Sequence, residues 1–317
     1  MILALSGGVG GAKLGRGLAD VVEGSELTIV VNTGDDFDFL GLRICPDLDS
    51  VAYGIAGLND EDRGWGRRDE SWHCEQALVE FGVDPWFHLG DKDLAIHLLR
   101  RSLLASGATA GEAMAQVARS LGIGCAIVPM TECRVETRVI TNVGELSFQD
   151  YFVRRRCEPM VSGFRFSGAE TASPSPTWFP AVAENRIRGV ILCPSNPFVS
   201  IDPILGLPGV RAAFKQEGST VVAVSPLVGG NSVKGPLAKM LRELGLPATP
   251  VTIAKHYADF LDGFVLDVRD EHFEPELRAM GLRVEVCDTL MSDRHASRRL
   301  ARSCLDLLIE CGSERAA

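Results

Sequence analysis

The first 14 residues, MILALSGGVGGAKL (1–14), place a short apolar run directly before a glycine-rich turn. Residues 2–5 and a second apolar run at 27–32 flank a stretch that reads as a helix from Ala12 to about Val22. A strand, a glycine turn, a helix and a second strand form the βαβ unit that begins many nucleotide-binding domains. The segment therefore predicts an α/β fold with a phosphate-binding turn, but it does not say which phosphate is bound.

Further apolar runs follow along the chain, with helical patterns between several of them, at residues 124–129, 189–193, 220–225 and 263–267. This alternation predicts a Rossmann-like, doubly wound, mostly parallel sheet in one domain that covers residues 1–317. The strand signal disappears between about residues 49 and 121, which predicts a helical insertion. In that insertion, the segment DKDLAIHLLRRSLLA (91–105) places Leu94, Leu98 and Leu99 on one helical face.

The composition argues against several classes of protein. The net charge of −10 disfavours a general nucleic-acid surface, because binding to a phosphate backbone relies on clustered Lys and Arg. The nine cysteines form no CxxC pair and are odd in number, so neither a zinc ribbon nor a disulfide framework is indicated. No apolar stretch approaches the roughly 18 residues that span a bilayer, and the start lacks signal-peptide features. We therefore expect a cytoplasmic protein without a membrane segment.

The glycine turn offers backbone amides to a phosphate through Gly8, Gly10 and their glycine neighbours. It is not a Walker A motif, because Gly-Lys-Ser or Gly-Lys-Thr is absent from its end. A dinucleotide fingerprint would require a small residue where Lys13 stands. A purely structural turn without a ligand remains the alternative.

The segment NTGDDFDFLGLRICPDLDS (32–50) follows the second predicted strand and carries the carboxylates of Asp35, Asp36, Asp38, Asp47 and Asp49. Close carboxylates repel one another unless water or a cation neutralises them. Mg²⁺ typically takes one or two protein carboxylates together with water and phosphate oxygens, which suits an acidic loop beside a phosphate-binding turn. The alternative is that some of these residues form turns or cap a helix.

Two other unusual loops follow predicted strands, CPSNPFVSIDPILGLPG (193–209) and SPLVGGNSVKGP (225–236), and LGDKDLAIH (89–97) opens a helix. Ligands of open parallel sheets bind beyond the carboxyl ends of the strands, so we expect the loops after strands to converge on one site. The histidines and serines show neither HExxH nor GxSxG spacing. This pattern favours phosphoryl transfer, in which a substrate supplies the attacking group.

From about residue 2 to 305, the chain resembles the 2-phospho-L-lactate transferase family of coenzyme F(420) biosynthesis. The resemblance is carried in order by LSGGVGGAKL, VNTGDDFDFLGLRICPDLDSVAYGIAGL, RGWGRRDESW, LGDKDLAIH, CPSNPFVSIDPILGLPGVR, VVAVSPLVGG with VKGP, and HYADFLDGFVLD with DTLM. The long CPSNPFVSIDPIL block makes the resemblance specific.

This resemblance implies a Rossmann-like domain with a helical insertion, a homodimer and a Mg²⁺-dependent transfer. The deazaflavin Fo would offer its terminal ribityl hydroxyl to the phosphorus that carries a small organic acid in an acid-diphospho-guanosine donor, and GMP would leave. The glycine loop would then bind the guanosine diphosphate part. The sequence does not identify the acid, which in the family derives from phospholactate, phosphoenolpyruvate or 3-phosphoglycerate.

The resemblance also assigns site residues. Asp49 of CPDLDS and Lys92 of LGDKD match Fo-binding positions, and Asp49 could also bind the metal or orient the hydroxyl as the catalytic carboxylate. Asp36 is a second metal candidate. The position of the loops adds nucleotide or phosphate contacts at Gly8, Gly10, Ser195, Asn196 and Lys234.

Two alternative functions remain open at the level of sequence. An NAD-dependent oxidoreductase would begin with the same strand, glycine turn and helix, but would need no Mg²⁺. A non-catalytic guanine-nucleotide-binding protein would bind GDP and turn nothing over. The motifs CPDLDS and LGDKD favour the transferase.

Overall fold

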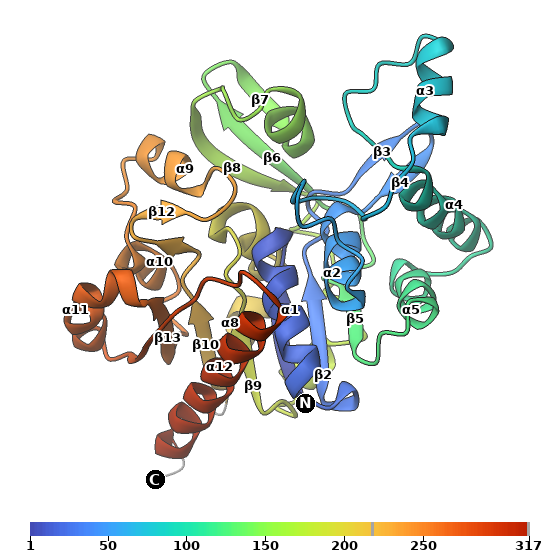
Figure 1. Ribbon diagram of the computed structural model, residues 1–317. Helices are drawn as coiled ribbons and strands as arrows, with labels where there is room; N and C mark the ends of the chain where they lie inside the picture. The colour runs from blue at the N-terminus through green and yellow to red at the C-terminus, as the bar shows by residue number, and fades with distance from the viewer. Residues whose placement is uncertain (217–218, 316–317) are drawn as a thin grey trace.

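A seven-stranded sheet forms the centre of the protein in this computed structural model, which describes residues 1–216 and 219–315 (Figure 1). Its strands in chain order are β1 (Ile2–Ser6), β2 (Leu27–Val31), β5 (Ala126–Pro129), β9 (Gly189–Leu192), β10 (Val221–Val224), β13 (Gly263–Asp267) and β14 (Arg283–Cys287). All neighbouring strands of this sheet are parallel. The predicted Rossmann-like α/β fold is therefore confirmed.

The strand order reverses its direction beside β1. The strands lie in the order β14-β13-β10-β9-β1-β2-β5. The chain runs outward from β1 to β2 and β5, and then returns to β9 on the other side of β1. Such a reversal is a topological switch point, and ligands of doubly wound sheets bind there, beyond the carboxyl ends of the strands.

Helices cover both faces of the sheet (Figure 1). They are α1 (Gly8–Val21), α2 (Pro46–Ala56), α3 (His73–Glu80), α4 (Asp91–Ala105), α5 (Ala110–Ser120), α6 (Phe179–Ala183), α7 (Asp202–Leu205), α8 (Val210–Phe214), α9 (Leu237–Glu243), α10 (Pro250–His256), α11 (Glu274–Ala279) and α12 (Arg294–Arg315). Within the described ranges, no helix combines the length and the apolar character that crossing a lipid bilayer requires.

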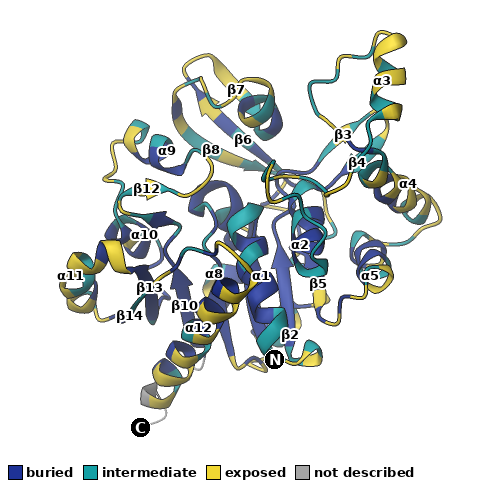
Figure 2. Ribbon diagram, viewed as in Figure 1, coloured by how far each residue is buried: buried dark blue, intermediate teal, exposed yellow. Residues whose placement is uncertain are grey.

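Side chains of alternate strand residues pack in two hydrophobic cores, one on each face of the sheet. Ile2 and Ala4 of β1 pack in the core that also contains side chains of α1, α2, α5 and α12. Leu3 and Leu5 pack in the other core, with side chains of α8 and α10. Figure 2 shows the central strands as buried and the outer faces of the helices as exposed. The fully buried strands explain why they read as continuous apolar runs.

The predicted insertion over about residues 49–121 contains most of α2 and all of α3, α4 and α5. The helices α2 and α5 contribute to the core on the sheet, whereas α3 has no buried residue. The predicted apolar face of α4 is wrong, because Leu98 and Leu99 are exposed. The buried side chains of α4 are Ile96, His97 and Arg100, so this helix turns polar groups inward.

Short antiparallel elements extend the loops at the carboxyl edge of the sheet. A three-stranded sheet has the order β7-β6-β8, with strands β6 (Glu136–Thr141), β7 (Gly144–Ser147) and β8 (Val161–Ser167). Two further hairpins pair β3 (Phe37–Phe39) with β4 (Leu42–Ile44), and β11 (Leu227–Val228) with β12 (Asn231–Ser232). The β3–β4 hairpin lies inside the acidic segment and separates its first aspartates from its last.

Candidate active site at the switch point

The N-terminus of α1 lies at the switch point, and its first backbone amide already has an acidic partner. Gly8 has a positive φ of 63° and donates its backbone N–H to Oδ1 of Asp47 over 2.7 Å. Asn32, directly after β2, donates its side-chain amide to Oδ2 of Asp47 over 3.0 Å. Asp47 is buried, and burial raises its pKa to about 6. A carboxylate therefore occupies part of the position where the sequence predicts phosphate. Asp47 is one of the five carboxylates of the acidic segment, but its contact with the glycine turn was not predicted, and Asn32 was not singled out.

Ser195 and Asn196 connect the loop after β9 to the glycine loop. The Ser195 hydroxyl accepts the backbone N–H of Gly7 over 3.2 Å and donates to the Gly7 carbonyl over 2.8 Å. The Asn196 side chain accepts the backbone N–H of Phe198 over 3.0 Å and thereby begins the turn Pro197–Ile201. The structure brings these two loops together as expected, and it uses both side chains to hold the loops in place.

Gly10 permits close packing between α1 and the loop after β9. A Cβ atom at this position would lie well inside van der Waals contact with the carbonyl oxygen of Pro194. The backbone of Pro194 cannot move away easily, because it directly precedes the Ser195 hydroxyl that binds Gly7. The absence of a side chain at Gly10 thus has a structural reason that is independent of phosphate binding.

We therefore expect Gly10→Val to destabilise the fold by about 1–3 kcal/mol, the usual cost of overpacking a tight contact. Urea unfolding measures this free energy. The matched control is Gly124→Val, because a Cβ at Gly124 meets no atom within 4 Å and its φ is not positive. An unchanged free energy of unfolding together with weakened GDP binding would contradict this reading and favour direct contact between Gly10 and phosphate.

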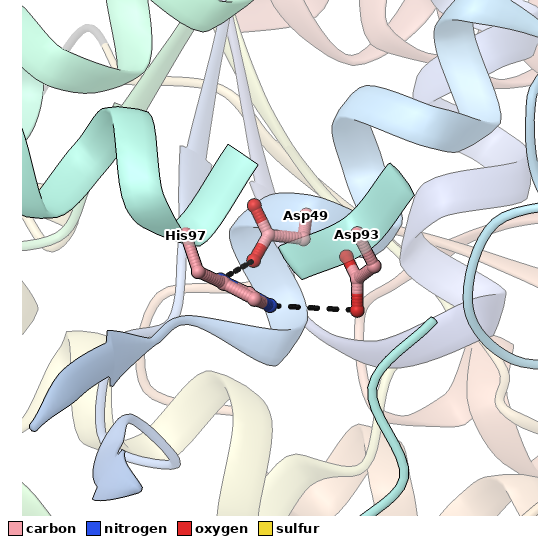
Figure 3. A group of neighbouring side chains, drawn as sticks. All are labelled: Asp49, Asp93 and His97. Atoms are coloured by element: carbon pink, nitrogen blue, oxygen red, sulfur yellow. Dashed lines mark ion pairs between the residues drawn. The ribbon is translucent and has the colours of Figure 1, made fainter. Parts of the chain in front are cut away.

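Asp49 belongs to a buried group of charged side chains between α2 and α4 (Figure 3). The imidazole of His97 lies between two carboxylates, with Nδ1 3.8 Å from Oδ2 of Asp49 and Nε2 3.4 Å from Oδ2 of Asp93. The two α4 residues share one face because they are four positions apart. The nearby imidazole of His97 and the hydrogen bond from the Tyr53 hydroxyl hold the pKa of Asp93 below its ordinary value, although burial opposes this.

Arg100 neutralises Asp49. Its Nη1 donates to Oδ2 of Asp49 over 3.2 Å, and its Nη2 binds Oδ1 of the same carboxylate. Although burial disfavours its charge, the nearby Asp49 carboxylate raises the pKa of Arg100. Asp49 does not cap α2, because the N-cap residue is Cys45 and both carboxylate oxygens face Arg100. Asp49, Asp93 and His97 offer ligand atoms within 4.8 Å of one another, which makes them a candidate cation site.

Lys92 lies in the first turn of α4, directly before Asp93. It is exposed, and its Nζ donates to the backbone carbonyl of Asp69 while its backbone N–H donates to Glu70 over 2.8 Å. The fold therefore places Lys92 and the buried Asp49 group at the same end of one helix. This amine has three N–H donors, so the bond to the Asp69 carbonyl leaves it able to donate to a ligand as well.

Asp36 and Asp35 are buried carboxylates whose hydrogen bonding is incomplete. Oδ2 of Asp36 lies 3.5 Å from Nε of Arg43, and burial raises the pKa of Asp36 to about 7. Burial and the charge of Asp47 also raise the pKa of Asp35. Among the described residues, Oδ1 of each has no hydrogen-bond partner. By contrast, Asp38 is exposed and pairs with Arg134 over 2.6 Å. Unpaired buried carboxylate oxygens suit a bound cation, so Asp36 fits a metal site by its chemistry.

Lys234, after β12, lies near the glycine loop, because Val9 of that loop lines the same pocket as Lys234. It lines a pocket on the side of α1 together with Lys13 and Arg16 of that helix. Gly229 and Gly230 form the turn of the short β11–β12 hairpin, which carries the chain to this pocket.

Comparisons with known proteins identify the family of the chain. The family model for 2-phospho-L-lactate transferase CofD matches residues 2–301. A phosphoenolpyruvate transferase of Kitasatospora aureofaciens is 40% identical, over 96% of this chain and 97% of that protein. A 2-phospho-L-lactate transferase of Methanosarcina barkeri is 37% identical, over 95% of this chain and 96% of that protein.

Solved structures agree with the fold. A protein of the UPF0052 family from Bacillus halodurans superimposes with a TM-score of 0.63 over 96% of this chain and 98% of its own, at 14% identity. At that identity the similarity supports the fold alone. The sequence matches lend no support to an NAD-dependent oxidoreductase or to a non-catalytic nucleotide-binding protein. The chain belongs to the 2-phospho-L-lactate transferase CofD family.

Proposed function

We propose that the protein transfers a phospho-acid group from an acid-diphospho-guanosine donor to the terminal ribityl hydroxyl of Fo. The ribityl oxygen forms the new bond to phosphorus, the bond between this phosphorus and the oxygen of GMP breaks, and the hydroxyl proton passes to a base. Support comes from the family, whose members at 37–40% identity are named for the transfer of such groups.

One structural observation carries the proposed chemistry, namely the buried group of Asp49, His97 and Asp93. Arg100 binds both oxygens of Asp49 and so orients the carboxylate that would accept the proton of the alcohol. His97 has an Nε2 atom without a hydrogen-bond partner among the described residues. The group thus contains both a charged acceptor and a neighbouring imidazole that can share the proton.

The proposed binding of Fo involves Asp49 and Lys92. Asp49 lies in the first turn of α2 and Lys92 in the first turn of α4. Lys92 would exchange its bond to the Asp69 carbonyl for one to a polar atom of Fo. A flexible lysine stem makes such an exchange inexpensive. Gly8 and Gly10 are assigned to the guanosine side of the donor through their position at the switch point, and Ser195 and Asn196 hold the loop beside them.

We also propose that the reaction requires Mg²⁺. The unpaired oxygen of the buried Asp36 fits an oxygen-seeking cation, whereas a metal bound by Asp49 would compete with Arg100. Asp35 offers a second unpaired oxygen. When bound, the ion would neutralise negative charge on the diphosphate.

The proposed transfer can be tested by mass spectrometry after incubation of the protein with Fo and Mg²⁺. Separate reactions contain the guanosine diphosphate donors of phospholactate, phosphoenolpyruvate and 3-phosphoglycerate. We expect at least one donor to give GMP and Fo enlarged by the phospho-acid group, and the donor that reacts identifies the acid. Absence of product from all three donors would contradict the proposed function.

A further inference from the structure

A second group of charged residues lines the pocket on the outer side of α1. Lys13 and Arg16 come from α1, Lys234 follows β12, and Glu61 and Trp65 belong to the loop after α2. The loop after α2 and the loop after β12 are in close contact here, because a Cβ on Gly64 would collide with Nζ of Lys234. We call this site the cation pocket, defined by Lys13, Arg16 and Lys234.

The cation pocket holds an excess of positive charge in a protein whose net charge is −10. Nζ of Lys13 donates to the backbone carbonyl of Met291 over 2.7 Å. Across the described part of the chain, no ion pair with a carboxylate is formed by Lys13 or Lys234. Of the two acids in the pocket lining, Glu61 pairs with Arg16 over 3.1 Å and Asp60 pairs with Arg63 over 2.9 Å. Two lysine charges are therefore left without a carboxylate partner.

Arg16 adds unused hydrogen-bond donors to this charge. Its side chain is 6% exposed, and only Nη1 has a partner, namely Glu61. Nε and Nη2 are buried without a hydrogen-bond partner among the described residues. Buried donors without partners cost free energy, so a guanidinium held in this state indicates that a ligand completes its hydrogen bonds. Burial, followed by the charge of Lys234, also lowers the pKa of Lys13.

The N-terminus of α1 is a poorer place for phosphate than its sequence indicates. Asp47 already accepts the backbone N–H of Gly8, and a phosphate placed there would face this carboxylate. The cation pocket offers the opposite charge on the side of the same helix. Ser50, which follows Asp49 in α2, lines the pocket, so a ligand bound there lies next to the first turns of α2 that carry the Asp49 group.

We propose that the cation pocket binds the diphosphate of the donor through the side chains of Lys13, Arg16 and Lys234, instead of the backbone of the glycine loop. This inference rests on the proposed function for the identity of the ligand. The three side chains supply charge-assisted hydrogen bonds, which are roughly twice as strong as neutral ones. The exposed Trp65 lies at the same pocket, beside any group that the diphosphate carries.

Calorimetry with GDP, inorganic pyrophosphate and guanosine tests the assignment. We expect Lys234→Met and Lys13→Met each to weaken GDP and pyrophosphate binding about tenfold or more, because each removes one charged donor to a phosphate. Guanosine, which lacks phosphate, should bind equally to all variants. The matched control is Lys255→Met, an exposed lysine of α10 that pairs with Glu276 over 3.0 Å; its affinities should equal those of the wild type.

Lys234→Met is the decisive variant, because Lys234 is exposed and its removal leaves no buried group unpaired. An unchanged affinity for GDP and pyrophosphate in this variant, with an unchanged melting temperature, overturns the proposal. Failure of wild-type protein to bind either probe overturns it as well. If the wild type transfers nothing to Fo but still binds pyrophosphate in a Lys234-dependent way, the cation pocket is confirmed as a phosphate-binding site and the proposed function is contradicted.

Discussion

Replacement of Asp49 by asparagine is expected to lower turnover by about 10²- to 10⁴-fold, the usual effect of losing a general-base contact. The amide keeps the shape of the side chain but removes the charge that orients or deprotonates the ribityl hydroxyl. The substitution should also destabilise the fold, because it leaves the buried Arg100 without its counter-charge. Removal of one partner of a buried ion pair lowers the free energy of unfolding by about 3–5 kcal/mol. Initial rates and urea unfolding measure the two effects separately.

The double variant Asp49→Leu with Arg100→Leu separates catalysis from stability. Removal of both charges at once is far less costly than removal of one, so the double variant should recover most of the lost free energy of unfolding. Its turnover should remain as low as that of Asp49→Asn. Recovered turnover in the double variant would show that Asp49 acts only as a structural partner of Arg100 and would remove it from the catalytic group.

The sequence predicts the parallel core well because fully buried strands leave a continuous apolar signal. All the apolar runs that were assigned to strands form strands of the central sheet. The edge strand β14 (Arg283–Cys287) was missed, since RVEVC alternates apolar and charged residues and most of its side chains are only half-buried. An edge strand has one sheet neighbour instead of two, and solvent reaches more of its side chains.

The candidate site was predicted less well, because charge pairing places its side chains and hydrophobic periodicity does not report charge pairs. In α4 the buried face carries His97 and Arg100, while Leu98 and Leu99 face solvent, so hydrophobic spacing indicates the wrong face. The spacing of Asp93 and His97 by four positions was a usable signal for a shared polar face. The partnership of Asp47 with Gly8 had no such signal, because it joins residues 39 positions apart.

Removal of divalent cations with excess EDTA is expected to lower turnover roughly 10²-fold or more, because the reaction places charge on a departing phosphate oxygen. The structure supports this expectation through Asp36 and Asp35, which keep unpaired carboxylate oxygens in buried positions. Burial raises the pKa of Asp36 to about 7, so a proton holds this group neutral at lower pH and a cation can replace the proton as pH rises. Stabilisation of the fold by Mg²⁺ should therefore grow as pH increases through about 7.

The cation requirement has a readout that does not depend on turnover. Mg²⁺ should raise the melting temperature of wild-type protein at pH 8 more than at pH 6, and it should raise that of Asp36→Asn little at either pH. Asp38→Asn is the matched control, because Asp38 lies two residues further on, in β3, but is exposed and paired with Arg134. Its response to Mg²⁺ should equal that of the wild type. EDTA already saturated with Mg²⁺ should leave the rate unchanged. Full turnover in excess free EDTA would show that charge on the diphosphate is neutralised by side chains alone, and the lysines of the cation pocket would then be the groups that do it.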